Sequence, residues 1–299
     1  MYIRPRFTFL VALGLAAAVF LALPVTPSNS LQANSQINSF ELVSVFEVQV
    51  ATGGENESAE IVTATKDGKT LIYTDAVAAS LGFVDISDPS NPEPDGSLEP
   101  PNGGEPTSVT VTPNGKWALV AVHDDGAGYL WVVDLSDFTT EHTIPLTNAA
   151  PFNVAQPDSV AVSPNGRYAA VAIENERDEE VNDGIMPQAP AGFLVIVDLV
   201  GAPTNWGTRF LKLTGIANRF ADDPEPEFID INSDNEAAVT LQENNHIVIV
   251  DLKKGKVTRD FSAGKSIHRA DLTDDDSEPA QFTEWLNARR EPDSIHWTP

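Results

Sequence analysis

The sequence predicts an all-β fold, a β-propeller whose blades are four-stranded antiparallel sheets. A motif that opens with Glu or Gln and leads through Pro or Ser into alternating apolar residues starts at Glu57, Glu105, Gln156 and Glu225. A Val-Asp-Leu or Val-Asp-Ile triplet closes the third strand of every unit. Repeats of about 50 residues are typical of propeller blades, whereas a β-sandwich, the alternative, needs no such repetition.

The first 30 residues predict a secretory signal peptide. Arg4 and Arg6 precede a 17-residue apolar run, residues 7–23, which is followed by small and polar residues. That run is at the short limit of a bilayer span, so an uncleaved anchor is the alternative. Residues 31–40 are expected to form a linker and residues 41–299 the propeller domain. We therefore expect an exported protein that is periplasmic, extracellular or located at the cell surface.

A turn signal separates the first two strands of each unit. Asp67-Gly68, Asn114-Gly115 and Asn165-Gly166 lie between alternating apolar runs, and Asp234-Asn235 takes this place in the fourth unit. Such dipeptides favour a two-residue type I′ hairpin, in which both central residues have positive φ. The second strands are accordingly predicted at residues 70–74, 117–122, 168–173 and 237–241.

The third strands are predicted to be the most buried. Residues 129–133 and 193–197 are continuously apolar, which favours strands covered on both faces. The Asp of each triplet (Asp85, Asp134, Asp198 and Asp251) is expected to hydrogen-bond in the following turn. More polar fourth strands, at residues 141–146, 208–213 and 256–261, suit the exposed edges of the blades.

The opening motif occurs a fifth time at residues 291–299, where the chain ends before the expected turn. Four blades and one further strand do not close a propeller, so we expect a C-terminally incomplete protein. Residues 278–289 are predicted to form a helix capped by Ser277, because Phe282, Trp285 and Leu286 have helical spacing.

The acidic residues concentrate in loops that lie on one face of a propeller. Glu or Gln at the start of each opening motif is expected nearest the central channel. Carboxylate and amide oxygens without thiols suit hard cations such as Ca²⁺. The predicted metal ligands are Glu57, Glu105, Glu225, Glu227 and Glu291. The other predicted ligand-binding residues are Asp124, Asp125, Gln156, Asp158, Glu174, Glu176, Gln242, Glu243, Asn244 and Asn245. A solvated acidic face without a specific ligand is the alternative.

Composition excludes several partners and cofactors. The chain has 18 Lys and Arg against 44 Asp and Glu, a net charge of −26, which argues against nucleic acids and anionic lipid surfaces. It has no cysteine, and therefore no disulfide or thiolate site. Nucleotide-binding and common hydrolase motifs are absent, so no organic cofactor is expected. We expect a monomer that contacts the membrane only through its signal peptide or a missing C-terminal anchor.

Two segments carry a family resemblance. Residues 156–168 (Gln-Pro-Asp-Ser-Val-Ala-Val-Ser-Pro-Asn-Gly-Arg-Tyr) resemble surface-layer and YVTN propeller repeats. Residues 225–229 (Glu-Pro-Glu-Phe-Ile) together with residues 239–245 (Val-Thr-Leu-Gln-Glu-Asn-Asn) are similar to the choice-of-anchor I family of exported propellers. The resemblance covers residues 40 to 299, with a departure at the expanded loop 174–191. Bacterial relatives are often labelled alkaline phosphatase or esterase-like phytase.

Two functions follow as expectations. The first is an exported binding or surface-associated module whose acidic face holds Ca²⁺, another cation, or a cationic or other small-molecule ligand, with a cell-surface or extracellular macromolecule as a further partner. The alternative is a Ca²⁺-dependent phosphoesterase, a phosphoric monoester hydrolase in which the same acids hold metal and activate water. Whether the protein is an enzyme stays open at this point.

Overall fold

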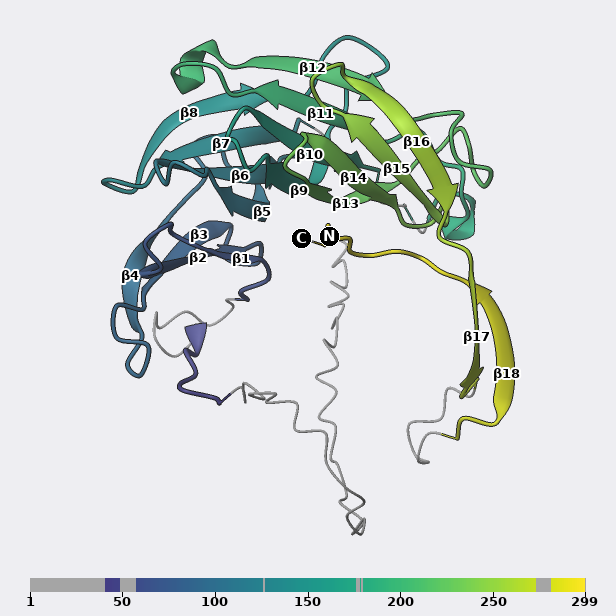
Figure 1. Ribbon diagram of the computed structural model, residues 1–299, viewed down its shortest axis with the longest axis horizontal. Helices are drawn as coiled ribbons and strands as arrows, with labels where there is room; N and C mark the ends of the chain where they lie inside the picture. The colour runs from purple at the N-terminus through teal and green to yellow at the C-terminus, as the bar shows by residue number, and fades with distance from the viewer. Residues whose placement is uncertain are drawn as a thin grey trace, which may run out of the picture. The chain divides into compact units, whose positions relative to one another are not determined.

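The computed structural model describes residues 41–48, 58–125, 127–175, 178, 180–272 and 281–298. The predicted signal peptide and linker lie outside these residues, and every element below belongs to the unit Leu42–Pro299. Four antiparallel sheets of four strands follow one another along the chain (Figure 1). In each sheet the strands are hydrogen-bonded in sequence order, so each sheet is one blade, and the predicted all-β architecture is confirmed.

The strands of the four blades have the following bounds. Blade 1 consists of β1 (Val62–Ala64), β2 (Thr70–Asp75), β3 (Ser80–Asp85) and β4 (Glu93–Leu98). Blade 2 consists of β5 (Glu105–Val111), β6 (Trp117–His123), β7 (Tyr129–Asp134) and β8 (Thr139–Pro145). Blade 3 consists of β9 (Gln156–Val162), β10 (Tyr168–Glu174), β11 (Phe193–Asp198) and β12 (Gly207–Lys212), with the short 3₁₀ helices η1 (Asn182–Gly184) and η2 (Pro203–Asn205). Blade 4 consists of β13 (Pro226–Ile231), β14 (Glu236–Leu241), β15 (His246–Asp251) and β16 (Lys256–Ser262).

The hydrophobic core is divided into layers between successive blades. Leu130 and Val132 of β7 pack in the layer shared with blade 3, whereas Trp131 faces the layer shared with blade 1. A third layer joins blades 3 and 4 around Leu194 and Val248. Because both faces of the middle strands are covered, their apolar runs are continuous, as predicted.

Blades 2 and 3, and blades 3 and 4, meet at a glycine. The N–H of Gly128, before β7, donates to the carbonyl of Ala155 at 3.0 Å, and Gly192, before β11, donates to Pro224 at 3.1 Å. A Cβ at Gly192 would lie 2.5 Å from Cδ of Pro226, the proline of the next blade's opening motif. The proline of the motif therefore packs on backbone of the preceding blade, and only glycine leaves room for it.

The turns between first and second strands differ from the type I′ prediction. Only the second residue of each dipeptide has positive φ, for example 74° at Gly115 and 63° at Asn235. The N–H of Thr112 donates to Trp117 at 2.9 Å and that of Gly115 donates to Thr112 at 2.7 Å, so the loop has four residues. Asn114 acts through its side chain, which accepts from the N–H of Lys116 at 2.9 Å.

The aspartates of the Val-Asp triplets hydrogen-bond locally, as predicted. Asp85, Asp134 and Asp251 accept from backbone N–H groups two or three residues later at 2.8–2.9 Å. Asp198 instead accepts from the guanidinium of Arg209 at 2.8 Å. These repeated residues shape the turns and lie outside the candidate site.

The predicted helix at residues 278–289 is wrong. Residues 284–289 form a strand, β18 (Glu284–Arg289), which pairs with β17 (Lys265–Ala270) in a two-stranded sheet. Pairing with β17 satisfies the backbone hydrogen bonds of β18 and leaves Trp285 67% exposed. The apolar residues with helical spacing therefore do not form a face that packs on the core. Ser277 lies outside the described residues. The described part of the chain contains no helix with the length and hydropathy needed to span a membrane.

Candidate functional site

Irregular pairing of the first strand with the second, in blades 2, 3 and 4, changes the direction of side chains in the opening motif. In β9, Pro157 pairs with Ile173 and Ser159 with Ala172, so Asp158 is one extra residue in the ladder. The same shift occurs around Thr107 in β5 and between Pro226 and Ile229 in β13. Such β-bulges break the strict alternation of side chains and redirect the extra residue.

In blades 2, 3 and 4 the bulges place the third and fourth residues of the opening motif around one cavity of about 310 Å³, which the fifth motif lines with its third and fourth residues and the first motif with its fourth and fifth. We call it the central cavity. Its lining residues are Glu60, Ile61, Thr107, Ser108, Asp158, Ser159, Glu227, Phe228, Asp293 and Ser294. The expected ring of first-position residues is therefore displaced, because Glu105, Gln156, Glu225 and Glu291 do not line this cavity. Glu57 lies outside the described residues.

The fifth motif closes one side of the central cavity without forming a strand. Residues 291–298 run beside β13, where the backbone N–H of Trp297 donates to the carboxylate of Asp230 at 2.7 Å. The indole N–H of Trp297 donates to the backbone carbonyl of Asp230 at 3.1 Å. This anchoring brings Asp293 and Ser294 to the cavity.

Carboxyl groups accumulate beside and within the central cavity. We call Asp158, Glu174, Asp223, Glu225, Glu227, Glu243 and Asp293 the carboxylate cluster. Burial, followed by the neighbouring Asp223, Glu174 and Glu243, raises the pKa of Glu225 to about 10. Burial and the charges of Glu174, Asp158, Asp293 and Glu243 raise the pKa of Glu227 to about 9. Burial and Asp293 raise the pKa of Asp158 to about 7.

Several oxygens of the cluster have no hydrogen-bond donor among the described residues. They are Asp223 Oδ1, Glu225 Oε1 and Glu227 Oε2, all of which are buried. Glu225 is only 1% exposed and Asp223 is fully buried. Buried polar atoms are normally paired, so these oxygens indicate that the folded chain lacks a donor or a positive charge at this place.

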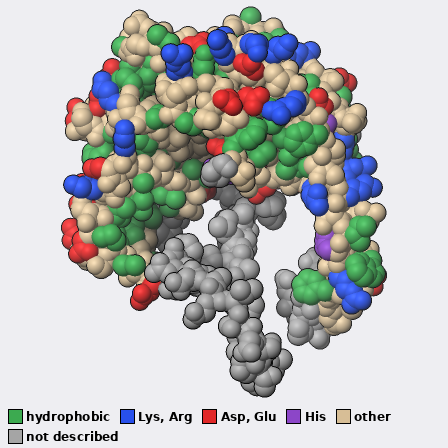
Figure 2. Space-filling view, viewed as in Figure 1, with side chains coloured by type: hydrophobic (Ala, Val, Ile, Leu, Met, Phe, Trp, Pro, Cys, Tyr) green, Lys and Arg blue, Asp and Glu red, His purple; other side chains and the backbone are tan. Residues whose placement is uncertain are grey.

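The positive side chains gather elsewhere. Figure 2 shows Lys and Arg along the upper edge, over the outer strands β12 and β16, which contribute Arg209, Lys212, Lys256 and Arg259. Arg259 reaches Glu236 at 3.1 Å. The residues that line the central cavity include no Lys or Arg. Positive side chains are therefore available on the outer strands, whereas none lines the cavity.

Two predicted ligand residues instead hold the backbone together. The side chain of Asn244 accepts from the N–H of Glu225 at 2.8 Å and donates to the carbonyl of Asp223 at 2.8 Å. It also donates to the carbonyls of Arg219 and Phe220. Asn245, with φ of 56°, donates to Gly264 at 2.8 Å and accepts from Ser262 at 2.7 Å. Their polar atoms are thus used within the chain.

Asn244→Ala is expected to destabilise the protein by about 2–3 kcal/mol, since the buried N–H of Glu225 and several carbonyls lose their partner. Thermal unfolding of the full chain measures the loss. Asn153→Ala, at an exposed asparagine, is the matched control and should leave the melting temperature unchanged. Equal melting temperatures for the two variants would contradict this role of Asn244.

The other predicted residues are dispersed. Glu105 is exposed and lies opposite His123 in the β5–β6 ladder. Glu291 is exposed and lies 3.8 Å from Arg219. Asp124 and Asp125 occupy the turn after β6, Gln156 lies opposite Glu174, and Gln242 precedes Glu243 in the turn between β14 and β15. Glu176 lies outside the described residues.

The described residues contain no group of three His, Cys, Asp or Glu side chains placed to hold a metal ion. Of the predicted residues, Asp158, Glu174, Glu225, Glu227 and Glu243 do come together in the carboxylate cluster. Asp223 and Asp293 belong to the acidic opening loops but were not among the predicted site residues, and the repeated third motif position was the signal that could have singled out Asp293.

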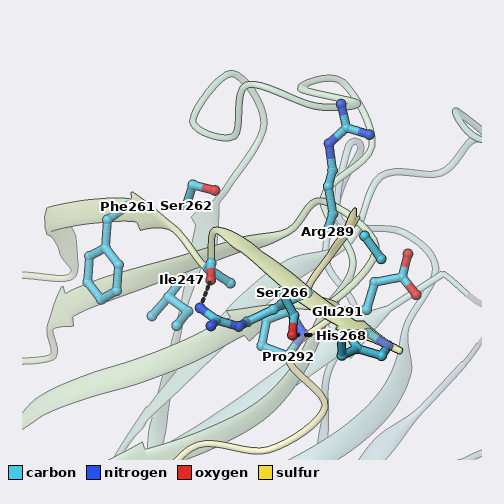
Figure 3. A pocket seen from close by; sticks show the side chains of 11 residues that line it. Ile247, Phe261, Ser262, Ser266, His268, Arg289, Glu291 and Pro292 are labelled. Atoms are coloured by element: carbon cyan, nitrogen blue, oxygen red, sulfur yellow. Dashed lines mark hydrogen bonds between the residues drawn. The ribbon is translucent and has the colours of Figure 1, made fainter. Parts of the chain in front are cut away.

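A second pocket, of about 590 Å³, lies between the end of β16 and the β17–β18 sheet (Figure 3). Ile247, Phe261 and Pro292 contribute apolar surface to it. Arg290 donates to the carbonyl of Ala263 at 3.0 Å beside it. Glu291 is the acidic residue in its lining, and no residue of the carboxylate cluster lines it.

Comparison with known proteins supports the fold. A family profile for the choice-of-anchor I domain matches residues 60–298. A candidate 6-phosphogluconolactonase from Bacteroides uniformis is 17% identical over 69% of this chain and 55% of its own, with a TM-score of 0.50. A second, from Bacteroides fragilis, is 16% identical over 69% and 55%, with a TM-score of 0.51. The chain thus spans about half the length of these structures. No curated protein sequence matches it significantly.

Proposed function

Because the chain belongs to the choice-of-anchor I domain family, we propose that it is an exported β-propeller module that binds a cation through its carboxylate cluster. Membership of this family indicates a secreted or surface-anchored protein. Similarity to the phosphogluconolactonase structures concerns the fold alone, because function depends on site residues that a shared fold does not specify.

One observation carries the proposal: Glu225 Oε1 and Glu227 Oε2 are buried oxygens without a donor among the described residues. An ionised carboxylate can only accept hydrogen bonds. Burying it without a donor costs on the order of several kcal/mol of free energy. The neighbouring acids increase this cost. A bound cation would remove it by supplying the missing positive charge.

Calcium fits the chemistry of the cluster but has no preassembled site in it. All the available donors are oxygens, which Ca²⁺ prefers. Since no three acidic side chains are already placed around one point, ion binding requires side chains of the cluster to move together. Glu225 and Glu227 would be the central ligands, and the ion would replace the protons that these groups hold at neutral pH.

Millimolar Ca²⁺ is expected to raise the melting temperature of the full chain, and a chelator to reverse the shift. At a concentration 100 times the dissociation constant the gain is about 2.7 kcal/mol. For a domain of this size that corresponds to about 5–10 °C. The Glu225→Gln/Glu227→Gln variant should show no shift.

The matched control is Asp95→Asn/Glu141→Gln, which likewise converts two carboxyl groups to amides, at exposed positions on the outer strands β4 and β8. It should keep the full calcium shift. An equal shift in all three proteins would assign calcium to the general acidic surface and refute a calcium site at the cluster.

The alternative, a metal-dependent phosphoesterase, would use the same carboxylates. No observation favours it specifically. Release of phosphate from p-nitrophenyl phosphate, abolished by a chelator and by Glu225→Gln, would favour hydrolysis over binding alone.

A further inference from the structure

We infer that the central cavity binds an organic polyammonium compound, a linear amine with two or more positive charges. The inference rests on the proposed function and names the class of cation that this cavity fits best. It concerns Asp158, Glu227 and Asp293 in the cavity and Glu225 next to them.

The size of the cavity favours a molecule over a single ion. Its volume is about 310 Å³, whereas one water in the liquid occupies about 30 Å³. Pockets for small molecules begin at about 300 Å³. A bare cation would leave most of this space to water, while an aliphatic amine would occupy it.

The arrangement of the charges favours a ligand whose own charges are spaced apart. Asp158, Glu227 and Asp293 come from β9, β13 and the C-terminal segment, and no three acidic groups of the described chain converge on one point. Ca²⁺ needs six to eight oxygens at about 2.3–2.6 Å from one centre. An amine with separated ammonium groups can meet these carboxylates one at a time.

The uncharged lining complements such a ligand. Thr107, Ser108 and Ser159 also line the cavity, and hydroxyl oxygens accept hydrogen bonds from ammonium groups. Phe228 and Ile61 supply apolar surface for methylene segments. The aromatic face of Phe228 can also attract a cation.

A second, independent observation indicates missing donors. Glu225 is 1% exposed, and its Oε1 has no donor among the described residues. Oε2 of Glu227, whose side chain lines the cavity, is in the same condition. An ammonium group in the cavity would bring the N–H donor and the positive charge that Oε2 of Glu227 lacks, and its charge would also act on the adjacent Glu225.

Calorimetric titration of the full chain with spermidine at about 0.15 M salt tests the inference, because this ionic strength screens attraction to exposed acids. Spermidine should bind with one-to-one stoichiometry. Asp158→Asn and Glu227→Gln should each weaken binding by about tenfold or more, as expected for a buried charge-assisted contact. Asp95→Asn and Glu141→Gln, both at exposed sites, should change it less than about twofold.

Ser294→Lys provides a test that keeps the acids intact. Ser294 lines the cavity and is exposed, so a lysine there should fold and place its own ammonium group among the carboxylates. This variant should melt at a higher temperature than the wild-type chain and lose spermidine binding. Undiminished spermidine binding by Ser294→Lys would overturn the inference.

Parallel titration with Ca²⁺ separates the two proposals. Calcium binding that depends on Glu225 and Glu227, without any spermidine binding, would overturn the polyammonium ligand and keep the proposed function. Absence of binding by both would overturn both. Spermidine binding weakened equally by the exposed control substitutions would assign it to the general acidic surface and overturn the inference.

Discussion

At pH 8 the Glu225→Gln/Glu227→Gln variant is expected to be more stable than the wild-type chain, and the difference should shrink towards pH 5. The ordinary pKa of a glutamate is 4.5, and the fold raises the pKa of Glu225 to about 10 and that of Glu227 to about 9. Between these limits the folded state binds more protons than the unfolded state. The contribution of these two groups to the stability of the folded state is therefore fully present below pH 4.5. It is lost as the pH rises towards their pKa values in the folded protein.

The size of the effect follows from Glu225 alone, because its side chain is almost fully buried. One proton of difference changes the free energy of unfolding by about 1.4 kcal/mol for each pH unit. For a domain of this size that corresponds to about 3–6 °C in melting temperature for each unit. Glutamine is neutral at every pH and can still donate to Asp223, so the variant lacks this slope.

Melting temperatures at pH 5, 6, 7 and 8, without added cations, measure this difference. Glu141→Gln, which removes an exposed carboxylate from β8, should follow the wild-type curve. A pH dependence identical in the double variant and the wild-type chain would show that Glu225 and Glu227 are ionised in the folded protein, contrary to our expectation.

Gly192→Ala is expected to lower stability by about 3 kcal/mol, at the upper end for an overpacked site. The new Cβ would lie 2.6 Å from the carbonyl oxygen of Ile173 and 2.5 Å from Cδ of Pro226. The first is backbone of blade 3 and the second a rigid ring of blade 4, so relief of the clash requires distortion of the β10–β11 ladder and separation of blade 3 from blade 4. The hydrogen bond from Gly192 to Pro224 would be lost with it.

Gly207→Ala is the control for this experiment. A Cβ at Gly207, the first residue of β12, meets no atom within 4 Å. Alanine there should be neutral or stabilise the protein by about 0.5 kcal/mol, because it restricts the unfolded chain. Chemical denaturation of both variants gives the comparison. A Gly192→Ala protein as stable as Gly207→Ala would refute the tight contact between blades.

Much of the fold follows from local sequence. The alternation of apolar residues and the glycines of the turns determine strands of similar bounds in all four blades, because each hairpin forms between neighbouring segments. Prediction fails at β18, where aromatic residues at helical spacing pair with β17 instead. It also fails in the turn type, since Asn114 acts through its side chain while its backbone keeps an ordinary φ.

The sequence by itself determined the blades, their order and the concentration of acids in the opening motifs, because these depend on periodicity and on contacts within one hairpin. Only the tertiary structure decided which acids meet. Bulges in β5, β9 and β13 direct the third motif residue to the cavity, and Asn244 is consumed by backbone hydrogen bonds. Both depend on how separate strands pair and pack, so no spacing within a single repeat reveals them.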